Sequence, residues 1–207
     1  MDSPRLRRLR QVPVFPLPKV VLYPGVTLPL YIFEERYKLM VSQALQGDRR
    51  IAISMLRQGE RGIATGRICG LGEIMEVQEL EEGEKNIMLR GIARIAIEEV
   101  NQEIPYIRAG AKVLQETACA AGTRGARVRE IVRMSQQFVF MLDAGNAGRL
   151  INLLSFMGDP SFLTDFVAFH LLQEETLKQE LLETLDVDAR LSRVKVVLQE
   201  ELAGLDS

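Results

Sequence analysis

The residues able to act as bases, nucleophiles or metal ligands are few and scattered in this sequence. Its one histidine, His170, lies in the apolar stretch Phe166-Val-Ala-Phe-His-Leu-Leu172. A catalytic base needs a nucleophile and an orienting group beside it, and this stretch provides neither. We therefore expect His170 to be packed in a helix or bonded to a helix end, and not to act as a base.

The cysteines, Cys69 and Cys119, lie far apart and lack the C-x-x-C spacing of a zinc site. A disulfide between them stays open as an alternative. Eight methionines beside only two cysteines are more typical of a reducing compartment, so we expect a cytoplasmic protein.

Phosphate-binding and metal-binding motifs are also missing from the sequence. There is no G-x-x-x-x-G-K-[ST] loop, and Gly70-Leu-Gly72 lacks the third glycine and the βαβ context of a dinucleotide motif. The acidic clusters Glu81–Glu84 and Glu98-Glu99 are typical of solvated turns and strand ends. The sequence therefore predicts a protein that is not an enzyme, with no cofactor and no metal.

Composition is ordinary for a soluble globular protein: 207 residues, 47% apolar and 26% charged, with a formal net charge of −2. This charge gives no bulk reason to expect nucleic acid or an anionic membrane as partner. No apolar run approaches the ~18 residues that a membrane span needs. Residues 1–10 carry four arginines but no apolar core follows them, so we expect a basic tail and not a secretory signal.

The first half of the chain has the period of two that is typical of strands. Residues 12–17 are apolar and contain prolines, which predicts a strand at a sheet edge or a strand end. Pro24-Gly25 suits a type II turn, and Leu28, Leu30 and Ile32 then alternate with other residues. One amphipathic helix follows, with Tyr37, Met40, Val41, Ala44 and Leu45 on one face. Further strands are predicted at residues 51–55, 67–80, 87–98 and 107–113, which favours a curled sheet or barrel.

From about residue 116 the apolar period becomes helical. Residues 117–125 are small and contain glycine, which suits a linker. Apolar stripes then predict helices over residues 128–142, 150–157, 162–172, 177–182 and 187–202, with Asp159 and Asp186 as N-caps. Strands first and helices afterwards predict the α+β class.

Several stretches of the strand-rich half resemble one known family. They are Val12-Pro-Val-Phe-Pro-Leu17, Val21-Leu-Tyr-Pro-Gly25, Leu28-Pro-Leu-Tyr-Ile-Phe-Glu34 and Gly91-Ile-Ala-Arg94. Together they resemble the Lon N-terminal domain, the substrate-recognition domain of the ATP-dependent Lon proteases. The resemblance covers roughly residues 10–115, and it departs at Cys69, where the family usually has glycine.

The resemblance implies a PUA-like β pseudo-barrel with one prominent helix over residues 10–116, followed by an α-helical bundle over residues 117–207. It also implies a non-catalytic module that binds unfolded or partly folded polypeptide, or acts as an adaptor for a protease or another protein. The ATPase and Ser-Lys peptidase of the Lon proteases lie in separate downstream domains, and nothing in this sequence resembles either.

Three aromatic residues are the candidates for polypeptide binding. Tyr31 and Phe33 lie opposite the leucine face of their predicted strand, and Tyr23 lies beside the Pro24-Gly25 turn. Exposed aromatic residues bury a large apolar area at a low cost in conformational entropy, which suits capture of unfolded segments. The alternative is that these side chains pack between the two halves of the chain.

Other functions remain open beside polypeptide binding. PUA-like barrels also bind RNA, and Arg124, Arg127, Arg129 and Arg133 lie together near the start of one predicted helix. The slightly acidic total favours arginines paired with nearby acids, so nucleic acid is not the expected partner. A purely structural subunit of a complex and a homodimer are further alternatives.

Overall fold

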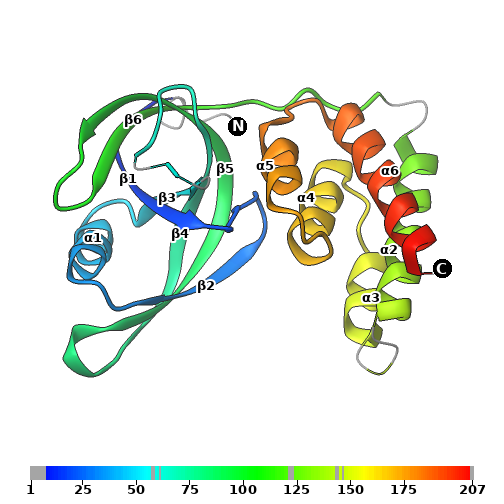
Figure 1. Ribbon diagram of the computed structural model, residues 1–207, viewed down its shortest axis with the longest axis horizontal. Helices are drawn as coiled ribbons and strands as arrows, with labels where there is room; N and C mark the ends of the chain where they lie inside the picture. Colours follow the sequence, from blue (N-terminus) through cyan, green and yellow to red (C-terminus); the bar gives the residue numbers. More distant parts are fainter. Residues whose placement is uncertain are drawn as a thin grey trace. The chain divides into compact units, whose positions relative to one another are not determined.

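A computed structural model describes residues 8–56, 59–60, 62–120, 124–142, 145 and 147–205 (Figure 1). The chain divides into two compact units, Met1–Gln115 and Glu116–Ser207. The division expected from the sequence lay one residue later. Most of the predicted basic tail lies outside the described residues, and Arg8 to Arg10 belong to the first strand.

The first unit contains six strands among its described residues, and they form a mixed sheet that curls into a near-barrel ring (Figure 1). The strand order is β2-β5-β4-β3-β1-β6, and β6 also pairs with β5, which closes the ring. Only the β1–β3 pair is parallel. The elements are β1 (Arg8–Pro18), β2 (Thr27–Ile32), α1 (Glu35–Gln46), β3 (Arg50–Leu56), β4 (Ile68–Glu79), the 3-10 turn η2 (Glu81–Gly83), β5 (Lys85–Gln102) and β6 (Ile107–Val113).

The core of the barrel is built by inward side chains that alternate along each strand. Apolar residues from five strands meet there, namely Val12, Val14, Ala52, Cys69, Leu71, Ile95, Ile97, Ala109 and Ala111. Helix α1 buries Tyr37, Met40, Val41 and Ala44 and packs against β1 and β3. The expected α+β fold and the helix's core face are therefore confirmed.

Of the two positions that the sequence predicted for the prolines of β1, the strand end is confirmed, because Pro18 is the last residue of the strand. The sheet edge is wrong, because β1 lies between β3 and β6 in the strand order. β1 pairs with β6 up to Val14 and with β3 from Val14 onward. Pro13 therefore lies where only β6 is a partner, and Pro16 and Pro18 lie where only β3 is. Proline has no N–H to donate to a neighbouring strand. An internal strand tolerates proline here because β1 has a neighbouring strand on only one side at each of these positions.

Tyr23 is fully buried, which corrects the expectation that it could join an exposed aromatic surface. The turn after it folds back onto β5, where the Gly25 N–H donates to the Gly91 carbonyl at 2.8 Å. The Arg94 guanidinium, also buried, lies 5.9 Å from the centre of the Tyr23 ring. The glycine and the arginine of the Gly91–Arg94 stretch thus both hold the segment that carries Tyr23.

Five helices make up the second unit within its described residues. They are α2 (Arg124–Leu142), α3 (Ala147–Ser155), α4 (Pro160–His170), α5 (Glu175–Glu183) and α6 (Val187–Leu205). Helix α2 packs against α3, α4 and α6. Both predicted caps are confirmed, because Asp159 accepts from the Phe162 N–H at 2.8 Å and Asp186 accepts from the Ala189 N–H at 3.0 Å. No described helix is long and apolar enough to cross a membrane.

Residues 116–120 attach to the start of α6 within the second unit. The Thr117 N–H donates to the Leu185 carbonyl at 3.0 Å, and the Asp188 carboxylate accepts from the Ala120 N–H at 3.0 Å. Glu116 pairs at 2.5 Å with Arg190, which is fully buried. Of the predicted linker, residues 121–123 lie outside the described part of the chain, and the preceding residues are bonded to the helical unit.

Candidate functional site

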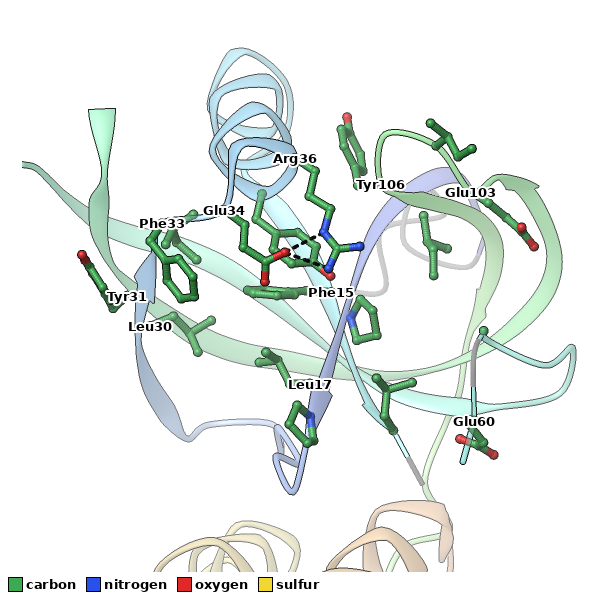
Figure 2. Close-up of a pocket in the computed structure, with 18 residues that line it drawn as sticks. Phe15, Leu17, Leu30, Tyr31, Phe33, Glu34, Arg36, Glu60, Glu103 and Tyr106 are labelled. Atoms are coloured by element: carbon green, nitrogen blue, oxygen red, sulfur yellow. Dashed lines mark hydrogen bonds and ion pairs between the residues drawn. The ribbon is translucent and has the colours of Figure 1, made fainter. Parts of the chain in front are cut away.

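The first unit carries a groove of about 690 Å³ between the end of β1, the end of β2 and the start of α1. Figure 2 shows Leu17 of β1 and Leu30 of β2 between the two strands, with Glu34 and Arg36 near the start of α1. The groove is lined by Phe15, Pro16, Leu17, Pro18, Leu30, Tyr31, Ile32, Phe33, Glu34, Arg36, Tyr37, Leu56, Glu60, Gly62, Glu103, Ile104, Tyr106 and Ile107. Most of this surface is apolar.

Tyr31 and Phe33 project from the solvent face of β2 and the residue after it. Leu28 and Ile32 take the inward positions, so the period of two leaves these two rings outside. Tyr31 is 52% exposed and Phe33 is 56% exposed. Their ring centres lie 5.6 Å apart with 30° between the ring planes, which is within the range of a stacking pair. The sequence therefore placed these two aromatics on the correct face.

The Tyr31 ring is fixed at its polar end. Its hydroxyl donates to the Glu84 carboxylate, which lies just before β5. The hydrogen bond to Glu84 is the main cause that raises the pKa of Tyr31, followed by slight burial and by the negative charges of Glu84 and Glu82. Tyr31 also borders a second hollow of about 420 Å³ over β2, β4 and β5. The phenol is therefore a neutral, oriented group at one end of the groove.

The wall beside α1 is held by packed rings and one ion pair. Phe15 and Tyr37 are both buried, with ring centres 4.1 Å apart. Arg36 pairs with Glu34 at 2.8 Å, and its guanidinium lies 4.5 Å from the centre of the Tyr37 ring. Burial is the main cause that raises the pKa of Tyr37. The wall thus combines a buried ring pair with an ion pair that is about half exposed.

The opposite end of the groove is formed between β5 and β6. Ile104 is 85% exposed there. Tyr106 beside it is buried, and its hydroxyl donates to Gln43 of α1. Sequence reasoning missed Phe15, Leu17 and Ile104 as groove residues. The only signal for Ile104 was an isolated apolar residue in a polar connection.

Of the three predicted site residues, the structure brings together Tyr31 and Phe33 and excludes Tyr23. The groove contains a hydrophobic surface with a few charged residues, and none of its described lining side chains is a histidine, cysteine, serine or lysine. No cluster of three or more metal-ligating side chains occurs in the described part of the chain. The arrangement suits reversible contact with apolar groups.

His170 packs against an aromatic ring, and the two cysteines are free thiols. The imidazole packs on Phe166 at 4.3 Å between ring centres, and burial is the main cause that lowers its pKa. Both cysteines are free. The Cys119 thiol donates to the Asp188 carboxylate at 2.9 Å, and this hydrogen bond is the main cause that raises the thiol's pKa. A thiol held protonated in this way is a poor nucleophile.

The arginines considered for RNA binding are partly engaged within the helical unit. Arg124 pairs with Asp159 at 3.5 Å, and Arg127 pairs with Asp188. The Arg127 guanidinium also donates to the Ser192 hydroxyl at 2.7 Å. Two of the four arginines thus pair with nearby acids, as the acidic composition favoured.

Comparison with known sequences gives Lon proteases among the relatives of this chain. The family model described as the ATP-dependent protease La (LON) substrate-binding domain matches residues 11–200. The Lon protease of Dictyoglomus thermophilum is 27% identical over 198 residues, covering 94% of this chain and 25% of the relative. The Lon protease of Escherichia coli strain K12 is 23% identical over 206 residues, covering 98% of this chain and 26% of the relative. This chain therefore spans about a quarter of the length of these relatives.

Solved structures with the same fold are also similar over most of the chain. The N-terminal domain of the Mycobacterium avium complex Lon protease aligns with a TM-score of 0.70 at 21% identity, covering 94% of this chain and 98% of that one. A Lon N-terminal domain protein from Xanthomonas campestris aligns with a TM-score of 0.66 at 18% identity, covering 90% of this chain and 97% of that one. With the family match over residues 11–200, the chain belongs to the Lon substrate-binding domain family.

Proposed function

We propose that this chain binds unfolded or partly folded polypeptide segments in the groove of its first unit, without making or breaking a covalent bond. The observation that carries the proposal is the stacked pair of Tyr31 and Phe33, more than half exposed at the edge of an apolar groove. A contiguous exposed apolar patch on a folded protein marks an interaction surface or a binding groove.

The groove suits weak and broad binding. Full burial of one aromatic side chain contributes about 1.5–3 kcal/mol, and Tyr31 and Phe33 would gain roughly half of that because each is already half buried. Leu17, Leu30 and Ile104 add further apolar area. The cost of ordering an unfolded segment is subtracted from these gains, so micromolar affinity is expected.

The way in which β1 ends indicates that side chains dominate recognition. Beyond Val14 this strand pairs only with β3. Proline has no N–H, so Phe15 and Leu17 must supply the amide bonds to β3, and Pro16 and Pro18 face the unpaired side. That side offers carbonyl oxygens but no amide donors at these prolines. Addition of a client as a regular extra strand is therefore disfavoured there.

The matched relatives are named as Lon proteases, and the family description names a substrate-binding domain. We propose the corresponding role for this chain, in which it holds client polypeptide or serves as an adaptor for a protease or another protein. A cytoplasmic location and a homodimer fit this proposal, and both free cysteines agree with a reducing compartment.

The test is the capture of a permanently unfolded client, such as carboxymethylated α-lactalbumin carrying a fluorescent label. Anisotropy is measured for the original chain and for the double variant Tyr31→Ser/Phe33→Ser. We expect the double variant to bind the client roughly tenfold more weakly. Its melting temperature should change little, because both side chains are exposed.

A matched control is Phe156→Ser, which removes a still more exposed ring from the helical unit. This control should bind the client as the original chain does. The proposal fails if the double variant binds the client with unchanged affinity. It also fails if Phe156→Ser weakens binding as much as Tyr31→Ser/Phe33→Ser, because the groove would then not be the specific site.

A further inference from the structure

We propose that Tyr31, Phe33, Glu82 and Glu84 form a subsite for a lysine or arginine side chain of the bound polypeptide. The segments selected would then be apolar stretches with a cationic residue next to them. This inference rests on the proposed function, because it names the class of segment that the groove prefers.

The hairpin between β4 and β5 carries Glu82 and Glu84, and the pairing of β2 with β5 brings these residues to the end of β2 that carries Tyr31. The Tyr31 hydroxyl donates to the Glu84 carboxylate, which fixes that carboxylate beside the exposed ring pair. Glu82 lies in the adjoining turn η2, and its carbonyl accepts from the Lys38 ammonium of α1 at 2.7 Å. The turn is therefore held against α1, and the carboxylates of Glu82 and Glu84 stay close to Tyr31.

The local charge at this end of the groove is negative because the nearby cations are already paired. Lys38 pairs with Glu35 at 2.9 Å. Arg36 pairs with Glu34 at 2.8 Å, and Lys85 pairs with Glu79 at 2.7 Å. Within the described residues, Glu82 and Glu84 have no ion pair of their own. Their negative charges also contribute to the raised pKa of Tyr31.

An exposed aromatic face beside two carboxylates has the chemistry that recognises a cationic side chain. The negative face of a Tyr or Phe ring attracts an ammonium or guanidinium group. The aliphatic stem of lysine or arginine covers the ring while its charged end reaches the carboxylates. Acidic residues in the same place would be repelled. The apolar neighbours of the cation would meanwhile lie in the groove at Leu17 and Leu30 (Figure 2).

The test compares two fluorescent peptides of about twelve residues with the same apolar sequence. One carries a single lysine and the other carries acetyl-lysine at that position, which keeps the aliphatic stem and replaces the ammonium group by a neutral amide. We expect the original chain to bind the lysine peptide roughly fivefold more tightly. The variant Glu82→Gln/Glu84→Gln should lose this preference and keep its affinity for the acetyl-lysine peptide, because glutamine can still accept from the Tyr31 hydroxyl.

The matched control is Glu200→Gln/Glu201→Gln, which makes the same change in net charge on an exposed part of α6. It should keep the preference for lysine. Raising the salt concentration from about 50 mM to about 500 mM should reduce the preference in the original chain.

Equal affinity of the original chain for the two peptides would overturn the subsite, and so would a preference that survives in Glu82→Gln/Glu84→Gln. The proposed function would stand in either case, since it requires only that the acetyl-lysine peptide binds at Tyr31 and Phe33. If neither peptide binds, the proposed function is wrong as well.

Discussion

The backbone of Gly91 lies directly against the carbonyl of Tyr23. A Cβ atom added at Gly91 would come within 1.9 Å of the Tyr23 oxygen, and the Gly91 N–H donates to the Val26 carbonyl at 2.8 Å. The same close approach occurs at Gly70, where a Cβ would lie 1.9 Å from the Leu22 oxygen. Two glycines on neighbouring strands thus make room for the segment that leads into β2.

Replacement of Gly91 by alanine should therefore destabilise the barrel unit. The clash involves backbone atoms that cannot move without breaking the Gly25 and Val26 hydrogen bonds, so we expect a loss of about 3 kcal/mol or more. Urea unfolding followed by circular dichroism measures the loss. The control Gly148→Ala lies in α3 with no atom within 4 Å of the added Cβ, and it should stabilise the chain slightly. A stable Gly91→Ala barrel would contradict the close packing of Tyr23.

The buried Arg190 in α6 should be required for the helical unit. Its guanidinium pairs with Glu116 at 2.5 Å and lies 3.8 Å from the buried carboxylate of Asp165. Arg190→Met leaves these acids without their cation, which costs about 3–5 kcal/mol. Arg193→Met on the same helix removes only an exposed pair with Glu180, which is expected to cost less than about 1 kcal/mol. Chemical unfolding of the two variants gives the comparison, and equal effects would be inconsistent with the buried pair.

Local periodicity was enough to predict most of the elements. The alternation at Ile87 to Ile97 and at Ile107 to Val113 marks β5 and β6, because a half-buried strand repeats every two residues. The caps at Asp159 and Asp186 are equally local, since a carboxylate needs only the first turn of its own helix. The outward direction of Tyr31 and Phe33 follows from the same alternation.

Features that depend on distant parts of the chain could not be predicted in this way. β1 is internal because Arg8 pairs with Lys112 of β6, and no local pattern encodes that ladder. Tyr23 is buried because Gly91, which has no side chain, lets the turn after Tyr23 pack directly on β5. Ile104 belongs to the groove only because ring closure brings the β5–β6 connection to it. Of the groove residues, the sequence therefore predicted only those in or next to β2, Tyr31 and Phe33.

The stability of the helical unit should fall at mildly acidic pH because of His170. His170 at the end of α4 keeps an exposed side chain, and the partial burial of its imidazole is the main cause that lowers its pKa, with the charge of Lys178 as the second cause. The expected effect on stability is therefore small. The unfolded histidine, with a pKa of about 6.5, therefore binds a proton more readily than the folded one as the pH falls. Above that pH both states are neutral and the effect is absent. The positive charge of Lys178 acts in the same direction as the partial burial, so it does not alter the sign.

Thermal unfolding at about pH 7.5 and about pH 5.5 tests this expectation. The melting temperature should fall more on acidification in the original chain than in His170→Gln, because glutamine has no group that binds a proton in this pH range. Far-ultraviolet circular dichroism reports the helices selectively. An identical loss in His170→Gln would assign the acid sensitivity to other groups.

A charge placed in the groove should abolish client binding without unfolding the barrel. Leu17 is only half buried, at the point where β1 has a single partner strand, so Leu17→Asp leaves the barrel core intact. The carboxylate would have to lose its hydration when an apolar client side chain covers it, which costs several kcal/mol. We therefore expect the anisotropy to fall to that of the labelled client alone. Met75→Asp makes the same kind of change at an exposed position of β4 that does not line the groove, and it should bind normally. Binding that survives Leu17→Asp would place the client on the Tyr31–Phe33 rim and not in the groove itself.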